Sequence, residues 1–324
     1  MSTPALNGPM PPVTRRVRAY FAPVNRTLAQ PAVFDAAASG LFNLSTPPAP
    51  WIDLGWIENF ARKSESTFGA VASGSPAAVQ VQVREALSAS VSFHFLTWGK
   101  LTMALSTGSQ HMNLLAEAAG AAPDGSGGHA ATATAIAPGS SSTFISLSAA
   151  NAALFSPGQM VAVDVDYTGQ IGYVGSAVSG AYVRSAGLVN SDPDYIRRIT
   201  FNVARVAQVT GIGLTLAQPL LAGAPAAGMK MQAISGFVDR EGGTFFHEWS
   251  ALFVLPGEQG DRILYYYPRL QAVTSAAESA QQLSASIERL ALKANCNALP
   301  VTDAIDGETV LCFRSFLPSP MTLL

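Results

Sequence analysis

The chain has few charged residues. Only 12% of its 324 residues are Asp, Glu, Lys or Arg, against ~25% in an ordinary soluble domain. So few charges protect a soluble monomer weakly against association. The composition therefore indicates either a surface covered by other subunits, which we favour, or a secreted chain rich in uncharged polar groups. The formal net charge of −2 argues against tight binding of nucleic acid, which needs a clustered basic face.

Cysteine and long apolar runs are also scarce. The two cysteines, Cys296 and Cys312, fit no zinc-binding spacing and predict buried thiols in a reducing compartment. The N-terminus lacks the apolar core of a signal peptide. The weakly charged run 206–229 is interrupted by Gln and Pro, so it does not predict a membrane span. We expect a chain made in the cytoplasm, with no membrane partner.

Motifs for catalysis are missing as well. The four histidines form no i, i+4 pair, and the chain has no Gly-x-Ser-x-Gly motif. We therefore expect no catalytic, cofactor-binding or metal-binding residues. One alternative stays open, in which the chain is an enzyme or carbohydrate-binding module. Asp164 and Asp166 would then supply a carboxylate pair, and Tyr265, Tyr266 and Tyr267 would stack on sugars or bases. A solvated strand face and core packing are the favoured interpretations of these two groups.

The strongest pattern in the chain is a long alternation from Val79 to Phe95. Its odd positions are apolar apart from Glu85, and its even positions are polar or small. A period of two places the two sets on opposite faces of one strand, and such a strand far exceeds the usual 5–6 residues. This pattern is typical of a wall or surface and is poor material for a catalytic loop.

The remaining sequence suggests a mainly β chain with three parts. Residues 1–50 are rich in proline and predict an extended N-terminal arm. Residues 51–142 and 234–324 predict a β-sandwich or barrel, and the turn-bounded short strands of 143–233 predict an inserted small β domain. One flanking α-helix is expected after Ser275. It rests on the capping-box pattern from Ser275 to Glu278 and on helical spacing of Leu283, Ile287, Leu290 and Ala294.

The segment from Trp51 to Phe60, with Asp53, Leu54, Gly55 and Trp56 at its centre, resembles the tail tube (major tail) proteins of long-tailed bacteriophages. The long strand that follows and the regions around 239–243, Trp249 and 266–269 add to the resemblance, which covers about 51–115 and 236–317. The segment 143–233 departs from the minimal family pattern. It is expected to be an external decoration of the tube.

The resemblance implies a non-enzymatic structural subunit. Such subunits assemble into stacked, usually hexameric, rings around a channel for DNA or effectors. It implies a virion tail location, assembly in the bacterial host cytoplasm, and contacts with itself and with sheath, terminator or tape measure proteins. DNA would pass without specific binding. The polar set of the long strand would line the channel, while Val79, Val81, Val83, Leu87, Val91 and Phe93 back onto the core. The channel-lining candidates are Gln80, Gln82, Arg84, Ser88, Ser90 and Ser92. Another virion or injection-machine protein, such as a capsid, baseplate or adhesin subunit, is the alternative.

Overall fold

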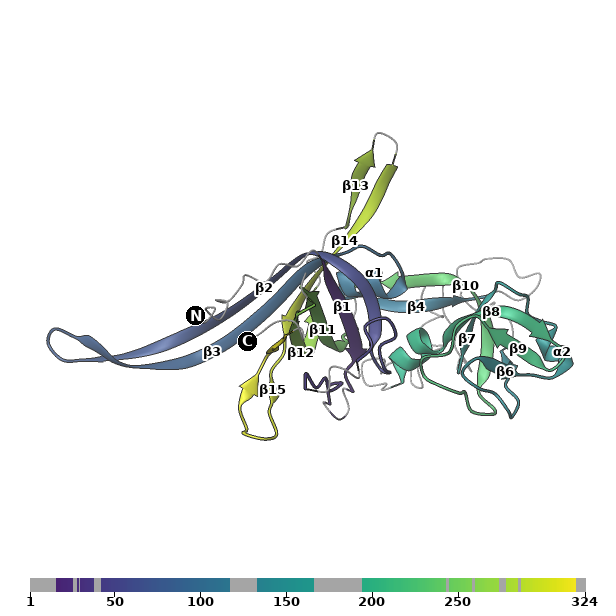
Figure 1. The fold of residues 1–324 in the computed structure, drawn as a ribbon, viewed down its shortest axis with the longest axis horizontal. Coiled ribbons are helices and arrows are strands. Elements are labelled where there is room, and N and C mark those ends of the chain that lie inside the picture. The colour runs from purple at the N-terminus through teal and green to yellow at the C-terminus, as the bar shows by residue number, and fades with distance from the viewer. Residues whose placement is uncertain are drawn as a thin grey trace, which may run out of the picture.

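The computed structural model describes residues 16–25, 28, 30–37, 42–116, 133–165, 194–242, 245–257, 260–273, 278–284 and 287–318, and of residues 278–284 and 287–290 it describes the backbone alone. The chain is mainly β, as predicted, with two large sheets at opposite ends of an elongated molecule (Figure 1). None of the helices in the described ranges is long and apolar enough to cross a membrane.

The first sheet closes into a six-stranded antiparallel barrel. Its strands follow one another in the spatial order β14, β3, β2, β1, β11, β12, and β12 pairs back onto β14. Two further strands extend it, β13 (Glu278–Ser284) beside β14 and β17 (Phe313–Leu317) beside β12. The barrel strands are β1 (Val17–Pro23), β2 (Ile52–Ser73), β3 (Ala78–Phe95), β11 (Glu248–Pro256), β12 (Arg262–Ala272) and β14 (Ile287–Ala298). A separate two-stranded ribbon joins β15 (Val301–Thr302) and β16 (Thr309–Val310).

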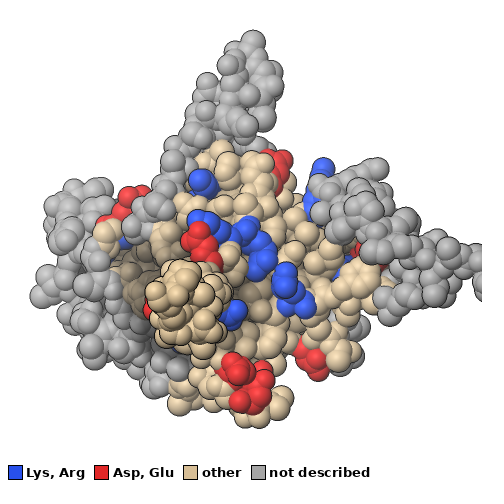
Figure 2. Space-filling model, turned by 90° about the vertical axis from the view of Figure 1, so that its left-hand side faces the viewer, with Lys and Arg blue, Asp and Glu red and all other residues tan. Residues whose placement is uncertain are grey.

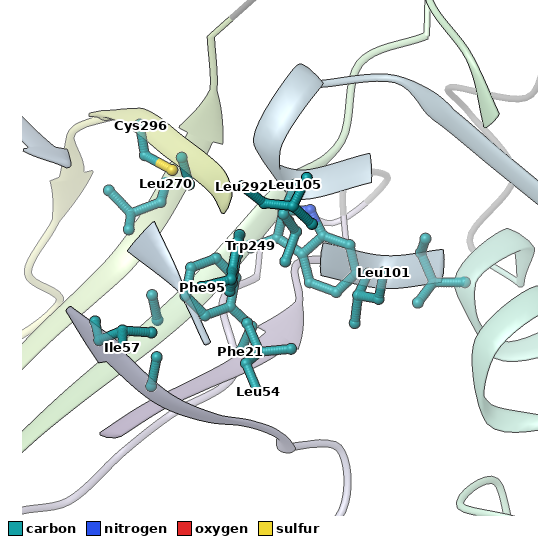
Figure 3. Close-up of a cluster of buried hydrophobic side chains, with 14 of the residues drawn as sticks. Phe21, Leu54, Ile57, Phe95, Leu101, Leu105, Trp249, Leu270, Leu292 and Cys296 are labelled. Carbon is teal, nitrogen blue, oxygen red and sulfur yellow. The ribbon is translucent and has the colours of Figure 1, made fainter. Parts of the chain in front are cut away.

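Aromatic side chains fill the barrel. The Phe253 ring lies 5.4 Å from Phe93 and 5.9 Å from Phe21 between ring centroids, and all three are at most 1% exposed. The helix α1 (Lys100–Thr107) covers one end of the barrel and adds Leu101 and Leu105 to the same core (Figure 3). Burying each such side chain contributes about 1.5–3 kcal/mol, so this packed core stabilises the barrel.

The described residues of the N-terminal region belong to the barrel and to its outer cover. Within 1–50, predicted as an extended arm, the strand β1 lies between β2 and β11 and buries both of its faces. Tyr20 faces outward into a second cluster with Phe42 and Trp51, which belong to the segment that follows β1. The Tyr20 hydroxyl donates to the Leu44 carbonyl at 2.8 Å. This segment therefore packs across the outside of β1, β11 and β12.

The predicted flanking helix after Ser275 is wrong. Glu278 begins β13, and residues 287–298 form β14, which pairs with both β3 and β12. Leu292, Ala294 and Cys296 alternate into the barrel core and are at most 2% exposed. The helical spacing of apolar residues was real, but the pairing that closes the barrel overrides local propensity.

The second sheet holds its own core. Its spatial order is β4, β10, β7, β8, β9, β6, with β5 beside β10, and it packs around Ile145, Val161, Leu214 and Met231. Since β4 and β10 both belong to it, the sheet draws on residues on both sides of the predicted boundaries near 142 and 233, and that division stays a prediction. Its strands are β4 (Gln110–Leu115), β5 (Thr134–Ala135), β6 (Phe144–Ser146), β7 (Met160–Val163), β8 (Val203–Thr210), β9 (Gly213–Leu216) and β10 (Lys230–Arg240). The short helix α2 (Ala149–Ala152) and the π-helix η3 (Arg197–Phe201) accompany it.

Candidate assembly surface

The strands β2 and β3 continue far beyond the barrel as a two-stranded hairpin, which we call the hairpin arm (residues 63–89; Figure 1). Strand pairing persists from Ser64 opposite Ala89 to Ser73 opposite Ala78. At about 3.3 Å per residue, these ten pairs reach roughly 30 Å from the body. Gly74, with φ of +100°, begins the turn at the tip of the arm, where a side chain would be strained.

The hairpin arm has no core of its own. Val91 and Phe93 are buried in the barrel, as predicted, at 1% and 0% exposure. The expectation that the earlier apolar residues of β3 also back onto the core is wrong, since the strand leaves the barrel before it reaches them. The large apolar side chains of the arm are 38–59% exposed. They are Phe68, Val71, Val79, Val81, Val83 and Leu87.

Both long edges of the hairpin arm lack a partner strand in the described chain. Strand β2 pairs with β1 only as far as Ile57, and β3 pairs with β14 only from Ser90 onward. Beyond these points the outward backbone groups of 63–73 and 78–89 face no other strand of the described residues. Bare edges of this length are templates for pairing with another chain, and proteins normally shorten or cover them.

Two β-bulges sort the side chains of the hairpin arm onto its faces. Thr67 lies opposite Ala86 but Phe68 lies opposite Arg84, so Glu85 is an extra residue. Further along, Val81 lies opposite Val71 and Val79 lies opposite Ala72. Gln80, between these two pairs, is therefore a second extra residue. Because paired residues share a face, each bulge reverses the alternation of β3. One face of the arm, which carries Leu87, is continuous with the barrel interior, and we call it the core-side face. We call the opposite face the outer face.

The structure therefore does not bring the six predicted channel-lining residues onto one face. Ser88, Ser90 and Ser92, opposite Glu65, Lys63 and Ala61, lie on the outer face. Gln82 and Arg84, opposite Ala70 and Phe68, lie on the core-side face, and Gln80 sits in the second bulge. The Arg84 guanidinium stands over the Phe68 ring at 5.8 Å from its centroid, which confirms that these two share a face.

The Glu85 bulge depends on a glycine across the strand. A Cβ on Gly69 would lie 2.2 Å from the Glu85 Oε1 atom and 2.9 Å from its Cδ atom. The Glu85 side chain thus crosses over Gly69 on the outer face. Beyond it, Val71, Val81 and Val83 share that outer face, because Gly69 pairs with Val83 and Val71 with Val81.

Charge around the hairpin arm is concentrated at its base. Figure 2 looks at the end of the molecule from which the arm projects, and Lys and Arg side chains gather on that end. Arg62, just before the arm, donates to the Tyr267 hydroxyl at 3.2 Å and lies over the Tyr265 ring. The arm itself holds two cations, Lys63 and Arg84, and two anions, Glu65 and Glu85, so its formal charge is zero.

The motif at 53–56 has a local structural role. Asp53 pairs with Arg18, whose guanidinium also lies 5.4 Å from the centroid of the Trp56 ring, and its Oδ1 accepts from the Gly55 N–H at 2.8 Å. Ala19 lies opposite Gly55 while Tyr20 lies opposite Asp53, which leaves Leu54 as the extra residue of a bulge, buried in the core. Gly55 has φ of +83°, which only glycine adopts without strain. The motif therefore builds the bend of β2.

A cavity of about 290 Å³ lies at the α1 end of the barrel, lined by Ser109, His111, His247 and Trp249 among others. The Ser109 hydroxyl donates to Asp239 at 2.5 Å, while His111 Nε2 lies 3.1 Å from Thr200 Oγ1. Ser109 therefore bonds to a carboxylate, and it makes no described hydrogen bond to a histidine. Burial, then the nearby Lys100 and His247, keep the pKa of His111 well below its usual value, which favours a neutral ring.

Next to this cavity, Lys100 connects α1 to the second sheet. Its ammonium group donates to Asn113 Oδ1 at 2.5 Å and to the Ile199 carbonyl. Burial lowers the pKa of Lys100 to about 7. These bonds hold α1, β4 and η3 together, so they position elements of both sheets.

The residues of the enzyme or sugar-binding alternative have structural surroundings. Tyr266 and Tyr267 are 8% and 0% exposed. Asp164 bonds to Arg197 at 2.6 Å and to Arg198 at 3.3 Å, and Asp166 lies outside the described residues. No group of three or more His, Cys, Asp or Glu in the described part is placed to hold a metal ion. Both cysteines are free, and burial raises the pKa of Cys296 to about 12, which makes its thiol unreactive.

No protein-family model and no curated protein matches the chain.

Proposed function

We propose that the chain is a structural subunit of a phage or phage-like tail tube, which assembles with copies of itself into stacked rings around a channel. The observation that carries the proposal is the hairpin arm, with its exposed apolar side chains and two bare edges. The resemblance of the segment around 51–60 to tail tube proteins supports the same function. We propose no enzymatic role.

The arm edges give a physical route to a closed ring. Its two strands run antiparallel, so the bare edge of β2 in one copy can pair with the bare edge of β3 in the next, and the pattern repeats around a symmetry axis. Each contact would satisfy backbone groups that are otherwise left to water. Closure leaves no free edge, which favours a ring over an open fibre.

The channel wall would come from the outer face near the base of the arm. Ser88, Ser90 and Ser92 share that face with Lys63 and Glu65. Such a surface is hydrated and close to neutral, so it would let DNA or an effector pass without holding it. In this proposal the subunit is part of a virion tail assembled in the host cytoplasm, and sheath, terminator or tape measure proteins are its further partners.

The test is electron microscopy of the purified chain beside a matched short-arm variant. In that variant an Asn-Gly turn replaces residues 66–87 and joins Glu65 to Ser88, which face each other in the hairpin. We expect rings or tubes from the full chain and monomers from the variant. A full chain that stays monomeric at every concentration, with tail partners present, would contradict the proposal. Closed shells would favour a capsid role instead.

A further inference from the structure

We infer that the cavity at the α1 end of the barrel binds a small, neutral aromatic molecule with two fused rings. This inference goes beyond the proposed function and does not depend on it. The cavity holds about 290 Å³ and is partly open to solvent, so a ligand can enter it. Because a cavity of about 150 Å³ holds benzene, this one has room for a second ring.

The walls of the cavity belong to the packed body of the subunit. Leu105 of α1 and Trp249 of β11 line it, and both are part of the barrel core at 2% and 3% exposure (Figure 3). Residues 271–273, at the end of β12, line it as well, and Ala272 lies opposite Cys296 of β14. The pairing and packing of the barrel therefore hold these walls in place before a ligand arrives, which lowers the entropic cost of binding.

Aromatic rings make up much of the lining. Phe245, His247 and Trp249 alternate along one segment, and their ring centroids follow one another at 5.3 Å and 6.1 Å. The His111 ring lies 6.3 Å from Phe245. Rings pack best against other rings, stacked with an offset or edge to face, so this lining favours a flat aromatic ligand.

The lining carries no formal charge. None of the described residues that line the cavity is Asp, Glu, Lys or Arg, and burial, then the nearby Lys100 and His247, keep the pKa of His111 low enough for a neutral ring. A charged ligand would lose its hydration here without gaining an ion partner. Ser109 and Gln271 add a hydroxyl and an amide to the lining, which suits a ligand with a single N–H or O–H group.

The test is equilibrium dialysis of the full chain with indole, a neutral molecule of two fused rings with one N–H. We expect saturable binding of one indole per chain. Indole-5-carboxylate has the same rings and a charge, and we expect it to bind more weakly by about tenfold or more, because its carboxylate would be desolvated. Both measurements are made on the unassembled subunit, so their outcome is separate from that of ring formation.

Two matched variants locate the site. Ala272→Trp places a large side chain on the cavity wall and should weaken indole binding by about tenfold or more. Ala153→Trp adds the same side chain at an exposed position of the second sheet and should bind indole like wild type. Thermal unfolding checks that both variants fold, and Ala272→Leu replaces Ala272→Trp if the larger residue prevents folding.

Three results would overturn the inference. Indole that does not bind saturably to the wild-type chain would show that the cavity takes no such ligand. Equal binding by wild type and a folded variant at Ala272 would place the ligand elsewhere. Equal binding of indole and its carboxylate would contradict the choice of a neutral ligand.

Discussion

Strands β2 and β3 run through both the barrel and the hairpin arm, but their surroundings in these two regions are opposite. Within the barrel, β2 and β3 have partners on both edges and a packed aromatic core on one face. Within the arm they have only each other, and both faces are exposed. An isolated two-stranded hairpin is marginally stable in water, and for this reason we propose that another copy of the chain completes the arm.

The largest expected difference between the two regions comes from removing one aromatic ring. Phe253→Ala would leave a cavity among Phe21, Phe93 and Phe60, and we expect a loss of about 3–5 kcal/mol in the free energy of unfolding. The matched change in the arm, Phe68→Ala, should cost less than about 1 kcal/mol in the unassembled subunit, because Phe68 is 54% exposed and has only the Arg84 guanidinium over its ring. Urea unfolding of both variants measures this. Equal costs would show that the arm packs on the body.

A smaller effect is expected where β2 bends inside the barrel. Asp53→Ala removes the ion pair with Arg18 and the bond to the Gly55 N–H, and we expect a loss of about 2–3 kcal/mol because the bonds are partly buried and charged. Asp53→Asn keeps an acceptor for Gly55 and should recover part of that loss. Thermal unfolding compares the two variants. If the alanine variant is as stable as wild type, the bend does not depend on this motif.

The junction of the barrel with the second sheet gives a pH-dependent prediction. Burial lowers the pKa of Lys100 to about 7 from an unfolded value of 10.5, so the folded chain binds fewer protons than the unfolded chain between these values. Stability should therefore rise with pH across that window. After allowance for the partial exposure of the residue, we expect a gain of roughly 2 kcal/mol. Urea unfolding at pH 7 and pH 10 measures the gain.

Lys100→Met is the control for this titration. It removes the titrating group and should flatten the rise between pH 7 and pH 10, although it also loses the bonds to Asn113 and Ile199. The slope with pH, and not the absolute stability, is therefore the informative quantity. An unchanged slope in the variant would assign the pH dependence to other groups.

The sequence predicts what depends on local pattern and fails where distant pairing decides. The alternation from Val79 to Phe95 predicts β3 correctly. The helix predicted after Ser275 fails because β14 closes the barrel by pairing with β3 and β12, two strands far away in the sequence. The local pattern of residues 275–294 does not indicate this pairing of β14 with β3 and β12.

The position of the long strand could be predicted from the sequence, but the face on which each of its side chains lies could not. Simple alternation assigns the polar residues from Gln80 to Ser92 to one face, whereas the extra residues Glu85 and Gln80 divide them. The one local signal was Glu85 itself, a charged residue in the apolar set, with a glycine at position 69 on the partner strand. A bulge needs an extra residue and room for its side chain, and Gly69 supplies the room.

Among these changes, deleting Glu85 should have the smallest effect on stability. Because nothing packs on this part of the arm, we expect a change of less than about 0.5 kcal/mol in the unassembled subunit. Because Glu85 is the unpaired residue, its removal should make the pairing regular, with Thr67 still opposite Ala86 and Phe68 still opposite Arg84.

Cross-strand disulfides can test this pairing. In the Cys312→Ser background, Phe68→Cys with Arg84→Cys should oxidise to an intrachain disulfide both with and without Glu85. Phe68→Cys with Glu85→Cys, the pair that a strand without the bulge would place opposite each other, should not. Glu85→Ala keeps the extra residue and should give the same Phe68–Arg84 disulfide, because the bulge depends on the number of residues and not on the carboxylate. A deletion that unfolds the whole subunit would show that the arm and the barrel form one cooperative unit, and the contrast between them would then be lost.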